Sequence, residues 1–178
     1  MTSGYLQGVR LVPSPNCDER PDGADPEVIV IHAISLPPGM YGGPDIERFF
    51  TNSLDLSAHP YYAEIRDLKV SAHFLVRRDG EVVQLVPISK RAWHAGRSWC
   101  EGRSRVNDFS IGVELEGSEF DPFDRRQYDA LAQLTRQLMQ QYPGINKDRI
   151  YAHSDIAPGR KTDPGPTFDW QRYFAQLA

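Results

Sequence analysis

The segment Ser71–Pro87, "SAHFLVRRDGEVVQLVP", constrains the fold of this chain more strongly than any other stretch. It contains two apolar runs, and the dipeptide Asp79-Gly80 lies between them. An Asp-Gly pair between strand-like runs is typical of the tight turn in a β-hairpin, because glycine adopts the backbone angles that such a turn requires. The sequence therefore predicts a β-sheet that includes a hairpin in this region.

Three further segments have the pattern of strands. Glu27–Ile34, "EVIVIHAI", is a short β-branched run typical of a buried strand. Phe109–Gly117, "FSIGVELEG", alternates, so that its apolar residues share one face while Glu114 and Glu116 share the other. Arg149–His153 predicts a short strand near the end of the chain.

Helical patterns lie between and after these strands. Residues 124–144 predict an amphipathic helix that begins at a capping box formed by Asp124 and Gln127 and ends at Pro143-Gly144. Its expected core stripe consists of Tyr128, Leu131, Leu134, Leu138 and Tyr142. Shorter helices are predicted at Asp45–Phe50 and Phe168–Leu177. Strands and helices mixed along the whole chain predict a single α/β domain over residues 1–178, built around one sheet.

The region Leu36–Asp67 separates two predicted strands by an unusually long excursion. It opens with the Pro/Gly-rich run "LPPGMYGGP", contains one predicted helix and otherwise reads as irregular. Excursions of this length are often lids or binding loops. We therefore treat residues 36–67 as a candidate lid.

Composition excludes several classes of protein. The net charge of -4 argues against general nucleic-acid binding, which normally needs a basic face. The two cysteines, Cys17 and Cys100, give neither a metal-binding spacing nor a disulfide framework. The sequence contains neither an apolar run of membrane-spanning length nor an N-terminal secretory signal. We therefore expect a soluble cytoplasmic protein that binds neither nucleic acid nor membranes.

Candidate metal ligands follow two of the predicted strands. His32 and His153 each lie at the carboxyl end of an apolar strand, where sites gather in open α/β sheets. Asp163 lies in the run "HSDIAPGRKTDPGP", whose prolines and glycines exclude a regular helix or a central strand. Two histidines, one aspartate and an open position form a usual catalytic zinc arrangement. The spacing has no local zinc signature, so a solvated surface loop remains the alternative.

Glu114 and Lys161 are candidate catalytic groups. A carboxylate among apolar neighbours has a raised pKa and can transfer protons, which would make Glu114 a general base. The alternative is an ion pair with an arginine, which we favour for Glu116. Lys161 is either solvated or held by the flanking residues beside a developing oxyanion.

Seven blocks of the sequence resemble the zinc-dependent N-acetylmuramoyl-L-alanine amidases. Within that family they are most similar to the cytosolic 1,6-anhydro-N-acetylmuramyl-L-alanine amidases of cell-wall recycling. The blocks follow one another in order across nearly the whole chain: "RLVPSPNCDERP", "VIVIHAISLPPG", "LDLSAHPYY", "SAHFLVRRDGEVVQLVP", "RAWHAG", "NDFSIGVELEG" and "HSDIAPGRKTDPGPTFDW".

The resemblance implies an architecture and a set of roles. The fold would be a central mixed β-sheet flanked by helices, as in amidases and peptidoglycan-recognition proteins. One zinc ion per chain would be held by His32, His153 and Asp163. Glu114 and Lys161 would be the catalytic pair. The reaction would be hydrolysis of the amide bond between anhydro-N-acetylmuramic acid and L-alanine in a muropeptide.

Five residues are candidates for substrate contact. The stem peptide of a muropeptide is anionic, so Lys69 and Arg105 are expected to meet it, the alternative being ordinary surface cations. Tyr61 and Trp93 could offer apolar faces to sugar or peptide, or could be core aromatics. His94, beside Trp93, is expected to line the site as a donor to a metal ligand.

Three departures from the family pattern concern the detail of substrate contact and leave the metal set whole. Ala33 stands where relatives often have asparagine, Lys69 where arginine is common, and Ser154 where cysteine is frequent.

Two rival functions remain. One rival is a non-catalytic muropeptide-binding module of the same fold, although such proteins usually lack a zinc ligand and this chain keeps all three matching positions. The other is a metal-free glycosidase that uses Glu114 and Glu116 as its acid pair.

Overall fold

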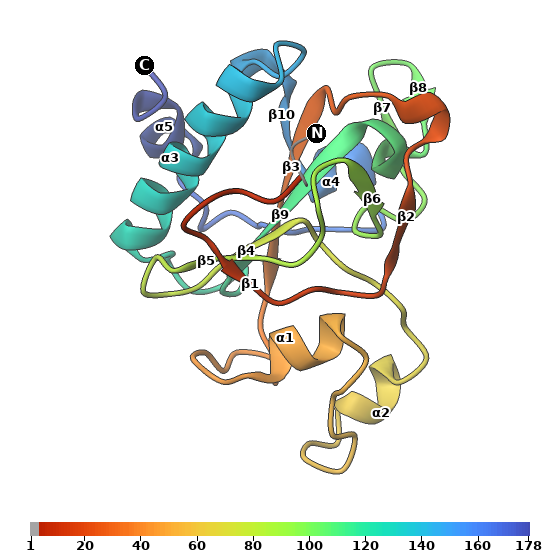
Figure 1. Cartoon of the computed structure of the whole chain (residues 1–178). Helices are drawn as coiled ribbons and strands as arrows, with labels where there is room; N and C mark the ends of the chain where they lie inside the picture. Colours follow the sequence, from red (N-terminus) through yellow and green to blue (C-terminus); the bar gives the residue numbers. More distant parts are fainter. Residues whose placement is uncertain (1–3) are drawn as a thin grey trace.

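A six-stranded mixed sheet forms the centre of the computed structural model, which describes residues 4–178 (Figure 1). The strand order is β1 (Arg10–Leu11), β5 (Val82–Gln84), β4 (Phe74–Val76), β9 (Ser110–Glu116), β3 (Val28–Ile34) and β10 (Ile150–Ala152). All neighbouring strands are parallel except β4 and β5. The prediction of one domain over residues 1–178 includes residues 1–3, which lie outside the described residues.

The antiparallel pair β4 and β5 is the predicted hairpin. The amide of Arg77 donates to the carbonyl of Glu81 at 2.9 Å, and the amide of Gly80 donates to the carbonyl of Arg77 at 2.9 Å. Gly80 has a φ of +88°, and a Cβ there would lie 2.9 Å from the carbonyl oxygen of Arg126. Both its conformation and its close contact therefore require glycine.

The longest strands, β3 and β9, lie side by side in the middle of the sheet and are buried on both faces. Val28 to Ile31 are fully buried, and every residue of β9 is buried. The alternation predicted for β9 is present, but its polar face packs inside the protein instead of facing water. The polar side chains of that face must therefore find partners within the fold.

Short two-stranded ladders and single 3₁₀ turns complete the strand connections. The ladders pair β2 (Cys17–Glu19) with β6 (Lys90–Ala92), and β7 (Trp99–Cys100) with β8 (Arg103–Ser104). The 3₁₀ turns are η1 (Pro21–Gly23), η2 (Val106–Phe109) and η3 (Lys147–Arg149).

Helices α3 (Arg125–Gln141) and α5 (Trp170–Ala175) pack together along one side of the sheet (Figure 1). α3 begins at the predicted capping box, in which the amide of Arg126 donates to Asp124 and the amide of Asp124 donates to the side chain of Gln127. The predicted stripe of α3 faces the core, and Leu131 and Leu138 are fully buried. Burying each leucine contributes about 1.5–3 kcal/mol relative to exposure.

The excursion over residues 36–67 carries α1 (Asp45–Phe50) and α2 (Tyr62–Ile65) at one end of the molecule (Figure 1). α1 has the predicted bounds, whereas α2 lies where an irregular segment was expected. Tyr62 is fully buried, and its hydroxyl donates to Asp45 at 2.7 Å. This long-range contact explains α2, whose local sequence gives no helical signal. That the excursion acts as a lid stays a prediction. Within residues 4–178, no helix has the length and apolar character needed to cross a membrane.

Candidate metal centre and active site

The carboxyl ends of three adjacent parallel strands bring the predicted residues to one edge of the sheet. The register of β3 and β9 places His32 directly opposite Glu114. β10 lies on the other side of β3 and ends at Ala152, so His153 follows it at the same edge. Asp163 approaches from the loop that follows His153.

The start of this loop differs from the prediction. His153–Ile156 forms the single-turn helix α4, where the proline- and glycine-rich run was expected to exclude regular helix. The four residues of α4 come before Pro158, so no residue of the turn lacks an amide proton. The side chain of Asp155 also accepts a hydrogen bond from the amide of Ala152 at 2.8 Å. The remainder of the run is irregular, as predicted, with a positive φ at Gly165.

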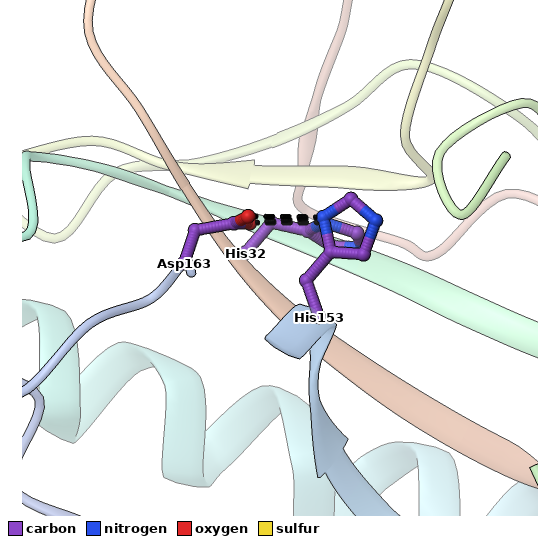
Figure 2. A group of neighbouring side chains, drawn as sticks. All are labelled: His32, His153 and Asp163. Carbon is purple, nitrogen blue, oxygen red and sulfur yellow. Dashed lines mark hydrogen bonds and ion pairs between the residues drawn. The ribbon is translucent and has the colours of Figure 1, made fainter. Parts of the chain in front are cut away.

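Three side chains converge with the spacing of metal ligands (Figure 2). His32, His153 and Asp163 each offer one ligand atom, and these atoms lie within 4.8 Å of one another. The Nδ1 atoms of the two histidines are 2.9 Å apart. Asp163 Oδ2 lies 3.3 Å from Nδ1 of His32 and 3.1 Å from Nδ1 of His153. The three groups could therefore hold one metal ion between them.

The other nitrogen of each imidazole is tied to the protein. His153 Nε2 lies 3.3 Å from the carbonyl oxygen of Ala95, which can only accept, so Nε2 carries the proton. His32 Nε2 lies 2.9 Å from His94 Nδ1, and His94 Nε2 lies 3.0 Å from the hydroxyl of Ser110. Both ligand histidines can thus present an unprotonated Nδ1 to the cluster, which is what metal binding requires.

The protonation states of the cluster also suit a divalent cation. Burial lowers the pKa of His32 to about 4, only partly opposed by its bond to Asp163, so this imidazole is neutral at pH 7. Burial works against ionisation of Asp163, but its contacts with the imidazoles of His153 and His32 outweigh burial, and its pKa falls below the usual range. Neutral imidazole and carboxylate donors are suitable zinc ligands, whereas calcium and magnesium prefer oxygen alone.

Glu114 is a buried carboxylate beside this cluster. Burial raises the pKa of Glu114 well above its ordinary value, and the nearby Asp163 raises it further. Its Oε2 is buried and, among residues 4–178, has no hydrogen-bond partner. Lys161 and Glu114 line one cavity at this edge of the sheet. The positive charge of Lys161 partly offsets the raised pKa of Glu114. An unpaired buried carboxylate oxygen is costly in a fold, so its position at a metal-binding cluster indicates a functional role.

Glu116, two residues further along β9, has a different environment. Its carboxylate accepts from the amides of Gly42 at 2.6 Å and Arg78 at 3.0 Å, and it pairs with Arg77 at 3.5 Å. The predicted ion pair with an arginine is confirmed. Because these contacts occupy its oxygens, Glu116 is not placed to act with Glu114 as the acid pair of a glycosidase.

A cavity of about 750 Å³ opens above the cluster, with His32, Glu114 and His153 among its lining residues. Of the five predicted substrate-contact residues, Tyr61 and His94 line it. The other three side chains are absent from the lining. Lys69 is exposed between two lining residues, Arg105 pairs with Asp108 at 3.2 Å, and the indole of Trp93 donates to Asp18 at 3.2 Å. Substrate contact by any of the five stays a prediction.

Two parts of the cavity wall were not named residue by residue from the sequence. One consists of apolar side chains from the excursion, which was predicted as a lid or binding loop, and from its flanks: Leu36, Pro38, Phe49, Phe50, Ile65, Leu68 and Val70. The other is the short segment Ser118–Asp121, which follows β9. The second could have been found, because a segment that directly follows the strand carrying Glu114 must begin at the same edge of the sheet.

Gly112 leaves the space that His94 occupies. A Cβ at position 112 would lie 2.4 Å from Cγ of His94. We expect Gly112→Ala to destabilise the metal-free protein by about 1–3 kcal/mol, the usual cost of overpacking, and to displace His94 from His32. Denaturant unfolding measures the first effect. Gly43→Ala is the control, because no atom lies within 4 Å of a Cβ there. Equal stability of the two variants would contradict this packing argument.

Residues 22–166 match the family model of the N-acetylmuramoyl-L-alanine amidases. The chain belongs to this family. The amidase is 56% identical over 173 residues to the 1,6-anhydro-N-acetylmuramyl-L-alanine amidase AmpD of Escherichia coli (strain K12), covering 97% of this chain and 94% of that protein. It is 49% identical to AmpD of Haemophilus influenzae, covering 98% and 95% of the two chains.

Solved structures agree with this assignment of the amidase. A crystal structure of a selenomethionine derivative of AmpD matches with a TM-score of 0.96 and 53% identity, covering 100% of this chain and 99% of that one. AmiD from E. coli, solved with the substrate anhydro-N-acetylmuramic acid-L-Ala-D-gamma-Glu-L-Lys, matches with a TM-score of 0.61 and 30% identity, covering 97% and 60%. The predicted family and the predicted mixed sheet with flanking helices are both confirmed.

Proposed function

We propose that this amidase hydrolyses the amide bond between 1,6-anhydro-N-acetylmuramic acid and L-alanine in muropeptides released during cell-wall recycling. The single observation that carries the proposal is the cluster of His32, His153 and Asp163 beside the unpaired carboxylate of Glu114, at the floor of one cavity. The names of the AmpD relatives and the substrate bound to AmiD support this choice of substrate.

We propose that one zinc ion per chain is held by Nδ1 of His32, Nδ1 of His153 and the carboxylate of Asp163. Zinc bound by three protein ligands would polarise the scissile carbonyl and lower the pKa of a water at its open position. The donor set, its burial and its net charge of one carboxylate support this assignment. His94, which contacts Nε2 of His32, would fix the orientation of that ligand.

The chain itself would supply two further groups. The charge of the bound zinc would favour the ionised form of Glu114. Glu114 would then accept the proton of the attacking water through its unpaired oxygen and return it to the alanine nitrogen as the amide bond breaks. Lys161 would place its ammonium group beside the negative charge that develops on the former carbonyl oxygen. Both side chains line the cavity that contains the metal-binding cluster.

The remaining contacts concern the two ends of the substrate. We propose that Tyr61 packs against the substrate within the cavity, and that Lys69 and Arg105 attract the anionic stem peptide from outside it. Trp93, whose indole donates to Asp18, would offer its apolar face to the sugar or the peptide from outside the cavity lining. A cytoplasmic location is part of the proposal, resting on the resemblance to cytosolic recycling amidases. Cell fractionation tests that location.

The test is a paired assay on one preparation of the protein. Purified chain is given anhydro-muramyl tripeptide before and after zinc removal by a chelator, and metal content is measured on the same samples. We expect free anhydro-N-acetylmuramic acid and tripeptide only while zinc is bound. Bound zinc without cleavage would instead identify a muropeptide-binding module. Cleavage that survives metal removal would contradict the proposed zinc dependence.

A further inference from the structure

The wall of the cavity formed by Ser118–Asp121 carries an aromatic ring that the fold does not cover. Phe120 is 86% exposed, whereas Met40 and Trp99, the next most exposed large apolar side chains among the described residues, are 59% exposed. Phe120 nevertheless lines the cavity that holds the metal-binding cluster. An exposed phenylalanine among the lining residues of a cavity leaves its ring available for contact with a ligand that enters the cavity.

The segment that carries this ring is anchored on both sides of Phe120. The hydroxyl of Tyr41 donates to Asp121 Oδ2 at 2.5 Å. The hydroxyl of Thr162 donates to Glu119 Oε1. Because residues 119 and 121 are both tied to other parts of the chain, the backbone at position 120 is held in place in the cavity wall.

The same segment packs against the loop that carries the catalytic lysine and the aspartate ligand. Gly165 has a φ of +86°, and a Cβ there would lie 2.6 Å from Cβ of Glu119. Thr162, which bonds Glu119, lies between Lys161 and Asp163 in the chain. Direct packing therefore fixes where the backbone at position 120 lies relative to this loop.

Charge distinguishes the two ends of the substrate at this wall. Glu119 and Asp121 flank Phe120 and also line the cavity. Their carboxylates repel the anionic stem peptide, but they can accept hydrogen bonds from the hydroxyl and amide groups of a neutral sugar. The face of an aromatic ring is electron-rich and attracts the weakly positive C–H groups of a pyranose ring. An aromatic face between two acceptors therefore suits a saccharide.

We propose that Phe120, flanked by Glu119 and Asp121, forms the saccharide-binding wall of the cavity and sets the preference for the sugar part of the substrate. This inference rests on the proposed amidase function. The sugar ring covers Phe120, and the anionic stem peptide leaves the cavity away from the carboxylates of Glu119 and Asp121. Phe120 is thus a specificity-determining residue and takes no part in proton transfer.

The test compares two substrates and one product. The zinc-loaded protein is assayed with anhydro-muramyl tripeptide and with a tripeptide whose alanine carries only a D-lactoyl group, which lacks the sugar ring. We expect Phe120→Ala to lower kcat/KM on the first substrate about tenfold, mainly through KM, and to leave the second unchanged. Phe120→Tyr should keep the wild-type preference. Trp99→Ala, which removes an exposed aromatic outside the cavity lining, is the matched control.

Binding of anhydro-N-acetylmuramic acid alone, measured by calorimetry, gives a second readout that does not depend on hydrolysis. We expect Phe120→Ala to weaken it about tenfold as well. Equal losses on both substrates, or sugar binding unchanged by Phe120→Ala, would overturn the saccharide-binding wall. If the wild type cleaved neither substrate, the proposed function would be overturned instead. Weaker sugar binding by Phe120→Ala would in that case still support the role of Phe120.

Discussion

Glu114→Gln is expected to lower kcat by about 10²–10⁴-fold while the protein keeps its metal. Glutamine has nearly the same shape as glutamate, but its amide cannot accept and return a proton. The three metal donors come from other residues, so metal content should match the wild type. Steady-state kinetics and metal analysis on the same zinc-loaded samples check both parts. Near-normal turnover would show that Glu114 is not the base.

The same substitution should also raise the stability of the metal-free protein at neutral pH. The pKa of Glu114 is raised in the folded state by burial, so folding favours its protonated form. The stability contributed by that form is present below the unfolded pKa of about 4.3 and is lost as pH rises through the higher folded value. Denaturant unfolding at pH 4 and pH 7 should show Glu114→Gln gaining on wild type at the higher pH only.

Asp163→Ala is expected to abolish stable metal binding, and with it hydrolysis. The substitution removes the only carboxylate of the proposed ligand cluster of His32, His153 and Asp163 and leaves two imidazoles. The affinity for zinc should fall by more than the 10–100-fold that loss of an outer-shell partner usually costs. Competition with a chromophoric chelator measures this affinity directly.

Lys161→Met is the matched control for the aspartate variant. Lys161 lies two residues before Asp163 on the same loop but is not one of the three donors. The Lys161→Met variant should therefore bind zinc like the wild type, while its kcat should fall by about 10²–10³-fold, as expected when one oxyanion-stabilising group is removed. If both variants bound zinc normally, the assignment of Asp163 as a ligand would be wrong.

Local signals in the sequence predicted the elements that depend on local physics. The hairpin at Asp79-Gly80, the capped helix α3 and the apolar strand β3 all have residue patterns that decide their structure over a few neighbours. Helix α2 was missed because a distant contact, the bond from Tyr62 to Asp45, holds it in place. Helix α4 was missed because the prolines and glycines of the run were taken to exclude a helix over its whole length. The first four residues of the run precede every proline and can form a turn.

Local patterns in the sequence indicated only part of the candidate site. Strand ends suggested His32 and His153, and the stiff loop after His153 added Asp163 as a candidate. The family resemblance was needed to assign the three as ligands, since they have no local spacing signature. The direction of loop side chains was beyond reach of the sequence. Trp93 bonds to Asp18 and Phe120 lines the cavity, and nothing in either loop sequence distinguishes these outcomes.

The pairing of β3 with β9 has a consequence for how this active site can fail. His32 lies opposite Glu114 because residues 28 to 34 are in register with residues 110 to 116. Side chains alternate between faces and both faces of these strands are buried, so a slip of one residue would exchange the apolar and polar faces of one strand inside the fold while it separated His32 from Glu114. A slipped register would therefore cost the protein its stability together with the alignment of the proposed ligand and base.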